Sequence, residues 1–410
     1  MKIYIKKFDC IFLFLMLLEI NFFCLIRFPD IYYLLNSHFH KVLTFLISIL
    51  LFVATVSIRN IKLFKTSIFG KYLVLFMSAW LVIYFASVLI YDNTSFVGAL
   101  LDYYYYWIVI LYFYLISKCR SDERNFIVMQ NIIKKCAVLY SAVLLVQYFF
   151  LSKNIEVLSF NDNFLTAGIN RRMMGGFEIV LFSGIFLCSD LFSISPKTTG
   201  NAIACIALEL LYLWKVAQSR SGVIIYLAMI YFSLFMNIKR KKTRRIFTIL
   251  AIVLFGFGLI LSYENIINYF LSMRASSYRQ RIREISFYGG KIFQNIFFGI
   301  GFLRDIPTNQ FELHGFENLY YISDIGILGF FAIWGLIGIL LSIAFWILNA
   351  KLIKKIRHTS GKYHNLIVCT YLYLVGTSIN LCTFDVQRIV FLPIMLAVID
   401  YSFNKLTEEI

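Results

Sequence analysis

Residues 318–349 read NLYYISDIGILGFFAIWGLIGILLSIAFWILN, and most of this stretch is apolar over a length that crosses a lipid bilayer as a helix. It begins with polar and aromatic residues that fit a turn at the membrane surface before the spanning part. Asp324 is its one charged residue. The stretch therefore predicts a transmembrane helix near Asn318–Asn349.

Similar apolar runs recur along the chain, which has 410 residues and is 60% hydrophobic and 18% aromatic. In lipid such runs satisfy their backbone only as helices, and the weak alternation of an outer-membrane barrel is absent. We expect an all-α polytopic membrane protein, a single integral domain over residues 1–410 with about twelve transmembrane helices. The predicted spans are Cys10–Phe28, Val42–Ile58, Tyr72–Tyr91, Val97–Ser117, Ile132–Leu151, Gly176–Ile194, Ala202–Val216, Val223–Ile238, Phe247–Ser262, Asn318–Asn349, His364–Phe384 and Ile389–Asn404.

The distribution of basic residues predicts the orientation, because Lys and Arg near helix ends are retained in the cytoplasm. With the N-terminus inside, cytoplasmic segments hold 25 of the 39 basic residues and outer segments hold 14. We therefore expect both termini in the cytoplasm. Ten of the 14 outer residues are arginine, against seven of the 25 inner ones. Because the planar guanidinium group of arginine is suited to binding phosphate oxygens, we expect the functional residues on the outer side.

Two outer segments, residues 152–175 and 263–317, are too long to be plain connectors. The second carries apolar residues whose spacing fits a helix lying on the membrane surface. On that helix Arg279 and Arg283 share a face, and Arg281 points elsewhere. These arginines either touch lipid headgroups or form a phosphate clamp.

The same loop continues into Gly299-Ile300-Gly301, which we expect to reverse the chain above the membrane. His314, Glu317 and Asn318 then precede the next spanning helix. Glu317 and Asn318 can simply complement and cap that helix. Alternatively, Glu317 or His314 is a general base at the boundary between water and membrane.

Further arginines lie at two other outer junctions. Arg171 and Arg172 precede the sixth span, and Arg220 lies between the seventh and eighth. A single arginine at a helix end commonly anchors the helix to the lipid surface, but three such junctions in one chain favour an anion site.

Acidic residues within or beside the spans have two interpretations, either a proton-coupled carrier or satisfied polar groups between helices. They are Glu19, Glu178, Asp190, Glu209, Asp324 and Asp385. Asp102, followed by Tyr103–Trp107, predicts a helix cap beside an aromatic belt.

The sequence gives no support for a bound metal, a nucleotide or a nucleic acid. Its eight cysteines form no CxxC pair, so we expect neither disulfide nor structural zinc, and it contains no DxD, HExxH or P-loop. The net charge of +17 needs no nucleic acid, since loops facing anionic lipid are basic. We expect the first apolar run to be a retained helix and not a removed signal.

Three elements in this order resemble the O-antigen polymerase and ligase superfamily. Ser219-Arg220-Ser221-Gly222 resembles its short SR signature at the start of a helix. Arg281, followed by an aromatic helix and Gly299-Ile300-Gly301, resembles the arrangement in its large outer loop. Glu317-Asn318-Leu319-Tyr320-Tyr321, with Asp324 to Gly329, resembles its ENxYL element. Together these elements cover roughly residues 165–335.

The resemblance implies a GT-C-like, metal-independent glycosyltransferase without a cofactor, in the bacterial cytoplasmic (inner) membrane. It would build O-antigen or capsule polysaccharide on the outer face, transferring a glycan from undecaprenyl pyrophosphate to a sugar hydroxyl of another lipid-linked repeat unit. Membrane lipid and a chain-length regulator protein would be its other partners. The pyrophosphate would be bound by Arg279, Arg281, Arg283, Arg220, Arg172, Arg171 and Asn318, and Glu317, His314 and Arg281 would be catalytic.

Two departures bear on the subtype. Many ligases of the superfamily have His where this chain has Glu317, which is closer to the repeat-unit polymerases. The proline common before the GxG is replaced here by Ile296-Phe297-Phe298. The alternatives are a ligase that transfers finished glycan to lipid A core or protein, and a lipid-linked oligosaccharide flippase. A flippase should show related halves and a charged central cavity, and no halves repeat in this sequence.

Overall fold

The computed structural model describes residues 6–20, 22, 39–56, 66–90, 95–151, 153, 155, 165–166, 172–173, 177–191, 196–238, 240, 242–246, 248–249, 253, 275–315, 320–357, 359–379 and 382–408. Most of the predicted span Phe247–Ser262 lies outside these residues.

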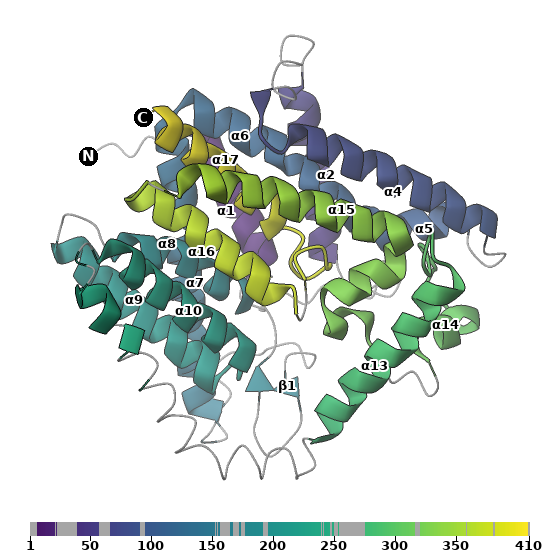
Figure 1. Cartoon of the computed structure of the whole chain (residues 1–410). Helices are drawn as coiled ribbons and strands as arrows, with labels where there is room; N and C mark the ends of the chain where they lie inside the picture. The colour runs from purple at the N-terminus through teal and green to yellow at the C-terminus, as the bar shows by residue number, and fades with distance from the viewer. Residues whose placement is uncertain are drawn as a thin grey trace.

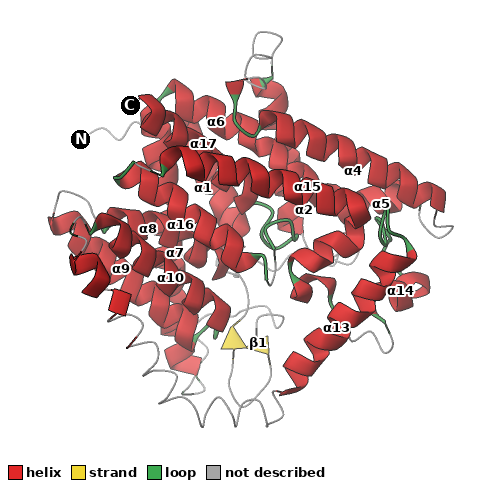
Figure 2. Cartoon of the chain, in the orientation of Figure 1, coloured by secondary structure: helices red, strands yellow, loops and turns green. Residues whose placement is uncertain are grey.

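The described part of the chain is overwhelmingly helical, as Figure 2 shows in red. One short antiparallel hairpin pairs β1 (Leu165–Thr166) with β2 (Arg172–Met173). The longer helices in chain order are α1 (Lys7–Glu19), α2 (Phe39–Thr55), α4 (Gly70–Ile90), α5 (Phe96–Tyr103), α6 (Leu111–Ser121), α7 (Glu123–Leu151), α8 (Phe177–Asp190), α9 (Pro196–Lys215), α10 (Arg220–Asn237), α13 (Ala275–Gln294), α15 (Ile327–Ile356), α16 (Lys362–Thr377) and α17 (Phe391–Glu408).

Five helical segments among the described residues are long and apolar enough to cross a membrane: Gly70–Ile90, Phe96–Ser121, Glu123–Leu151, Arg220–Asn237 and Ile327–Ile356. This agrees with a helical membrane protein. The expected number of twelve spans and the GT-C-like arrangement stay predictions.

The helices form one packed bundle, with α16 packed against α8, α10 and α17, and with α17 also packed against α6. In Figure 1 α17 lies at one side of this bundle, and α13 lies at the opposite edge beside α14 (Gln310–His314). The shell of the bundle is apolar: Leu50 and Leu89 are 69% and 79% exposed, as expected of surfaces that face lipid.

Several predicted boundaries are wrong, and local hydrogen bonds or charge explain why. α7 begins nine residues before the expected Ile132, because its charged first turns continue the helix beyond the apolar run. The span expected at Val97–Ser117 changes to a 3-10 helix, η4, at Tyr104–Ile110. There the carbonyl of Tyr103 accepts a hydrogen bond from Trp80 Nε1 at 3.3 Å, in competition with the helical ladder. Asp102 lies inside α5, whose cap is Ser95, so the expected cap role of Asp102 is wrong.

A break in α15 holds the large loop in place. At Gly335 the backbone leaves the helical region (φ 55°, ψ −143°), and Gly299-Ile300-Gly301 lies against the break. Ile300 N donates to Ala332 O at 2.8 Å, and Gly301 N donates to Ile333 O at 3.0 Å. A Cβ at Gly299 would lie 2.2 Å from Ala332 O. The two glycines therefore dock the loop into a spanning helix, a larger role than the expected chain reversal.

The turn expected before the last long span is confirmed. A 3-10 helix, η8 (Ile322–Ile325), precedes α15, and Gly326 follows it at φ 60°. A Cβ at Gly326 would lie 2.4 Å from Ser378 O, where α16 has just ended. Positive φ and this close approach both require glycine. The turn thereby joins the start of α15 to the end of α16.

Candidate functional site

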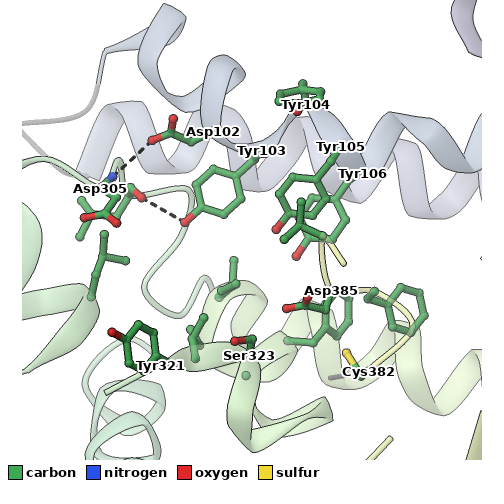
Figure 3. Close-up of a pocket in the computed structure, with 18 of the residues that line it drawn as sticks. Asp102, Tyr103, Tyr104, Tyr105, Tyr106, Asp305, Tyr321, Ser323, Cys382 and Asp385 are labelled. Atoms are coloured by element: carbon green, nitrogen blue, oxygen red, sulfur yellow. Dashed lines mark hydrogen bonds between the residues drawn. The ribbon is translucent and has the colours of Figure 1, made fainter. Parts of the chain in front are cut away.

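A cavity of about 450 Å³ lies where four separate segments meet. These segments are α5 with η4, the loop after Gly301, η8 with the start of α15, and residues 382–386. Figure 3 shows Asp102 and Tyr103–Tyr106 on one side and Tyr321, Ser323, Cys382 and Asp385 on the other. The charge pattern predicts that all four segments lie on the outer side of the membrane. Their convergence makes this end of the bundle the candidate site.

Tyrosines form much of one wall. Tyr103 stacks on Phe302, with ring centroids 4.5 Å apart, and Tyr105 lies 4.4 Å from Tyr106. The Tyr103 hydroxyl donates to Leu303 O at 3.0 Å. These contacts fix the outer loop against the spanning helix, so the rings are held in place.

A histidine and two aspartates lie at one end of the cavity. His314 Nε2 lies 3.0 Å from Asp305 Oδ2, and His314 Nδ1 lies 3.1 Å from Tyr320 O. Asp102 Oδ2 in turn accepts from Asp305 N at 3.3 Å. Both ring nitrogens of His314 therefore face acceptors, which the imidazolium form satisfies best, and the hydrogen bond to Asp305 raises the pKa of His314. This geometry suits a cation or proton donor better than a proton acceptor.

Asp385 faces the cavity from the loop before α17. Burial raises the pKa of its carboxyl to about 6, against which the hydrogen bond from Gln387 N at 2.9 Å and the charge of Arg388 act. Arg388 is itself buried and pairs with Glu178 at 2.5 Å. The loop carrying Asp385 is thus fixed to the start of α8 by a buried ion pair.

Glu284 on α13 is a buried carboxyl that the sequence did not single out. Its Oε1 accepts from Tyr321 N at 3.3 Å and from Gln280 Nε2 at 3.4 Å, whereas Oε2 is buried without a hydrogen-bond partner. Burial raises its pKa. Its position one helical turn before the buried Tyr288 could have signalled an inward-facing acid. Glu284 joins the arginine-bearing helix to Tyr321, a residue of the cavity wall.

The arginines of α13 lie near this wall without lining the cavity. Arg279, Arg281 and Arg283 are exposed on one continuous helix, which agrees with the expected helix and with the shared face of Arg279 and Arg283. Within the described residues none of the three has an ion pair. The positive charge of Arg281 reaches Glu284. α13 packs against η8, and its contact with the cavity wall is the hydrogen bond between Glu284 and Tyr321 N.

Arg220 belongs to a second cavity, of about 290 Å³, which Lys215, Gln218 and Ser219 also line. Ser219 caps α10, its Oγ accepting from Gly222 N at 3.3 Å. A Cβ on Gly222 would lie 2.8 Å from that Oγ. The serine and glycine of this motif therefore shape the helix start and leave the arginine at its outer end. Arg220 is not among the residues of the first cavity.

The remaining predicted site residues are described in part or not at all. Glu317, Asn318 and Arg171 lie outside the described residues, and Arg172 is described only as a β2 residue that pairs with Thr166. The structure thus places His314 in the lining of the cavity, Arg279, Arg281 and Arg283 on the exposed surface of α13, and Arg220 in the second cavity.

Most of the buried acids named from the sequence have partners between helices. Glu209 accepts from Ser183 Oγ at 2.5 Å and from Tyr226 Oη at 2.7 Å. The others are paired as Glu19 with Lys41, Asp190 with Lys134, and Glu178 with Arg388. Within the described part of the chain, no group of three or more His, Cys, Asp or Glu side chains is arranged to hold a metal ion.

No protein-family model matches this chain, and no curated protein matches it either.

Proposed function

We propose that the chain is a polysaccharide polymerase that works on the outer face of the bacterial cytoplasmic membrane. It would transfer a growing glycan from undecaprenyl pyrophosphate to a sugar hydroxyl of a second lipid-linked repeat unit. The observation that carries the proposal is a tyrosine- and carboxyl-lined cavity whose wall residue Tyr321 is hydrogen-bonded to Glu284 of the arginine-bearing helix α13. A lipid-linked sugar pyrophosphate has these two parts, one rich in hydroxyls and one strongly anionic.

In the proposed reaction the bond between the anomeric carbon and the pyrophosphate oxygen breaks. The acceptor hydroxyl oxygen bonds to that carbon, its proton passes to a base, and undecaprenyl pyrophosphate leaves. Arg281 and Arg279, with Arg283 and Arg172 in support, would stabilise the charge on the leaving group. These side chains could neutralise the pyrophosphate without a metal ion.

Glu317 remains the proposed base. His314 is less suited to that role, because both of its nitrogens face acceptors and its pKa is raised.

The test of the proposal is Arg281→Lys, compared with the matched control Arg240→Lys. Lysine keeps the charge but loses the bidentate fork, so we expect polymer formation to fall by roughly a hundredfold in Arg281→Lys. Arg240 is exposed in a segment that the charge pattern places in the cytoplasm, and its variant should behave like the unaltered chain. A near-normal amount of surface polysaccharide in Arg281→Lys would contradict the proposed role of Arg281 in binding pyrophosphate.

A polymerase and a ligase differ in the molecule that accepts the glycan, and a deletion strain distinguishes them. In a strain that lacks the chain, loss of the ladder of repeat units with single units retained supports the polymerase. Accumulation of free lipid-linked polymer would instead identify a ligase.

A further inference from the structure

The sign of the charge around the 450 Å³ cavity restricts what can bind there. Its lining includes three carboxyl groups, of Asp102, Asp305 and Asp385, together with His314, and contains no Lys or Arg. Arg304, which is not part of the lining, pairs with Asp102 at 3.8 Å. With His314 protonated and Arg304 counted, the summed charge of these groups is still negative. An anionic ligand is therefore repelled, and the pyrophosphate of a lipid-linked donor belongs outside this cavity.

The shape and the rings of the cavity indicate what it does accept. Its volume lies within the roughly 300–1,000 Å³ usual for small-molecule sites. Tyr103 to Tyr106 and Tyr321 offer flat apolar faces together with hydroxyl groups. A sugar ring has apolar C–H faces and hydroxyl donors around its edge. The rings can stack on those faces, and the carboxylates can accept from those hydroxyls in charge-assisted hydrogen bonds.

The carboxyl groups are held at opposite ends of the cavity. Asp102 and Asp305 are joined through the Asp305 backbone N–H, whereas Asp385 lies on the loop fixed by Arg388 and Glu178. Figure 3 shows Tyr103 between these two ends, with Tyr105 and Tyr106 on the side of Asp385. A sugar ring between them would meet a carboxylate on either side, and an acid group on that ring would meet one in either orientation.

We infer that this cavity binds a sugar unit of the lipid-linked substrate and selects sugars that carry no acidic group, neutral hexoses and amino sugars over uronic acids. The inference rests on the proposed function, because that function identifies the sugar as part of a lipid-linked substrate. It extends that function by naming the substrate class and by separating the sugar site from the arginines of α13.

The test uses the purified full chain in detergent micelles and three matched hexose probes, glucose, glucosamine and glucuronate. Saturation-transfer NMR, which detects weak binding, gives their relative affinities. We expect glucose and glucosamine to bind at least roughly tenfold more tightly than glucuronate at neutral pH. Removing one facing charge in Asp102→Asn or Asp385→Asn should reduce that ratio severalfold, whereas Asp122→Asn, an exposed carboxyl outside the cavity, should leave it unchanged. Ser323→Phe, which places a ring in the cavity, should abolish binding of all three.

Glucuronate binding as tightly as glucose, an unchanged ratio in both cavity variants, or no binding by any probe would overturn the inference. Elution as a single species by size-exclusion chromatography establishes that each variant is folded. Polymer formation is scored separately. If the chain shows the expected sugar selectivity but forms no polymer, only the proposed polymerase function is refuted. If it forms polymer but prefers glucuronate, only the proposed sugar selectivity is refuted.

Discussion

Asp400 lies within α17 and Asp385 lies in the loop before this helix, and their surroundings differ. The buried carboxylate of Asp400 accepts four hydrogen bonds, from Arg120 Nη2 at 2.7 Å, Tyr112 Oη at 2.5 Å, Ile68 N at 2.8 Å and Asn404 Nδ2 at 2.7 Å. The half-buried Asp385 accepts from Gln387 N, in its own loop, and faces a cavity. A carboxylate whose acceptor sites are filled by the protein is structural, and one turned toward a cavity has capacity left for a ligand.

The same contrast holds for the wider regions. The end around Asp400 joins α6, α17 and the segment before α4, and the charge pattern predicts that this end of the bundle faces the cytoplasm. The other end contains Glu284 and Glu178, each with one buried oxygen that lacks a hydrogen-bond partner. Among the described residues these are the buried carboxylate oxygens that lack a partner, and leaving such an oxygen without a donor is costly.

The largest expected effect is a difference in the loss of stability when Asp400 or Asp385 is replaced by alanine. Asp400→Ala leaves the guanidinium of Arg120 and the Tyr112 hydroxyl without their acceptor, so the free energy of unfolding should fall by about 3–5 kcal/mol. Asp385→Ala should lower the free energy of unfolding by about 1 kcal/mol or less, because few groups lose a hydrogen-bond acceptor when this carboxyl is removed. Denaturant unfolding in detergent micelles, followed by tryptophan fluorescence, measures both. Equal losses would show that the two ends do not differ in this way.

The next effect concerns the docking of the outer loop. Gly299→Ala places a methyl group against Ala332 O at a backbone position with φ of 61°, so it should destabilise the chain by about 3 kcal/mol. Gly290→Ala is the matched control, since it lies within α13 and its Cβ would meet nothing within 4 Å. That variant should be more stable than the unaltered chain by about 0.5–1 kcal/mol. If both variants keep full stability, the loop does not depend on this docking contact.

A smaller effect is expected at Glu284. Glu284→Gln keeps the size of the side chain and removes a buried charge with an unpartnered oxygen, so the free energy of unfolding should change by less than about 1 kcal/mol, toward greater stability. The same measurement applied to Asp400→Asn should show a clear loss. A loss of equal size in Glu284→Gln would mean that Glu284 is as fully satisfied as Asp400.

The smallest effect is a pH dependence of sugar selectivity. Because the pKa of Asp385 is raised to about 6, this carboxyl is ionised above that pH and neutral below it. The preference for glucose over glucuronate should therefore be full above pH 6 and weaken as the pH falls through it. The ratio of the two affinities between pH 5 and 7.5 measures this, and in Asp385→Asn it should vary less. The other groups near Asp385 are Arg388, Glu178, Lys41, Cys382, Tyr105 and Tyr106.

Much of the fold follows from local sequence, and much of the site does not. The apolar length of the run around Trp334 predicts a spanning helix, and the periodicity after Ala275 predicts the arginine-bearing helix. The break at Gly335 and its contact with Gly299 depend on packing between distant segments, which no local pattern contains. Asp102 was expected to cap a helix. Its carboxylate instead accepts a hydrogen bond from Asp305 N, which lies 203 residues further along the chain and is not visible in the local sequence. The cavity is built from such long-range contacts, so the sequence named His314 and Asp385 without placing them together.

The central claim is that the chain joins lipid-linked repeat units, and reconstitution tests it most directly. The purified chain in liposomes would be given undecaprenyl-pyrophosphate-linked oligosaccharide, with Arg281→Lys in parallel, and the products would be separated by gel electrophoresis. We predict a ladder of products that differ by one repeat unit, with release of undecaprenyl pyrophosphate, and a much weaker ladder from Arg281→Lys. Movement of the oligosaccharide across the bilayer without any lengthening would contradict the claim and identify a transporter.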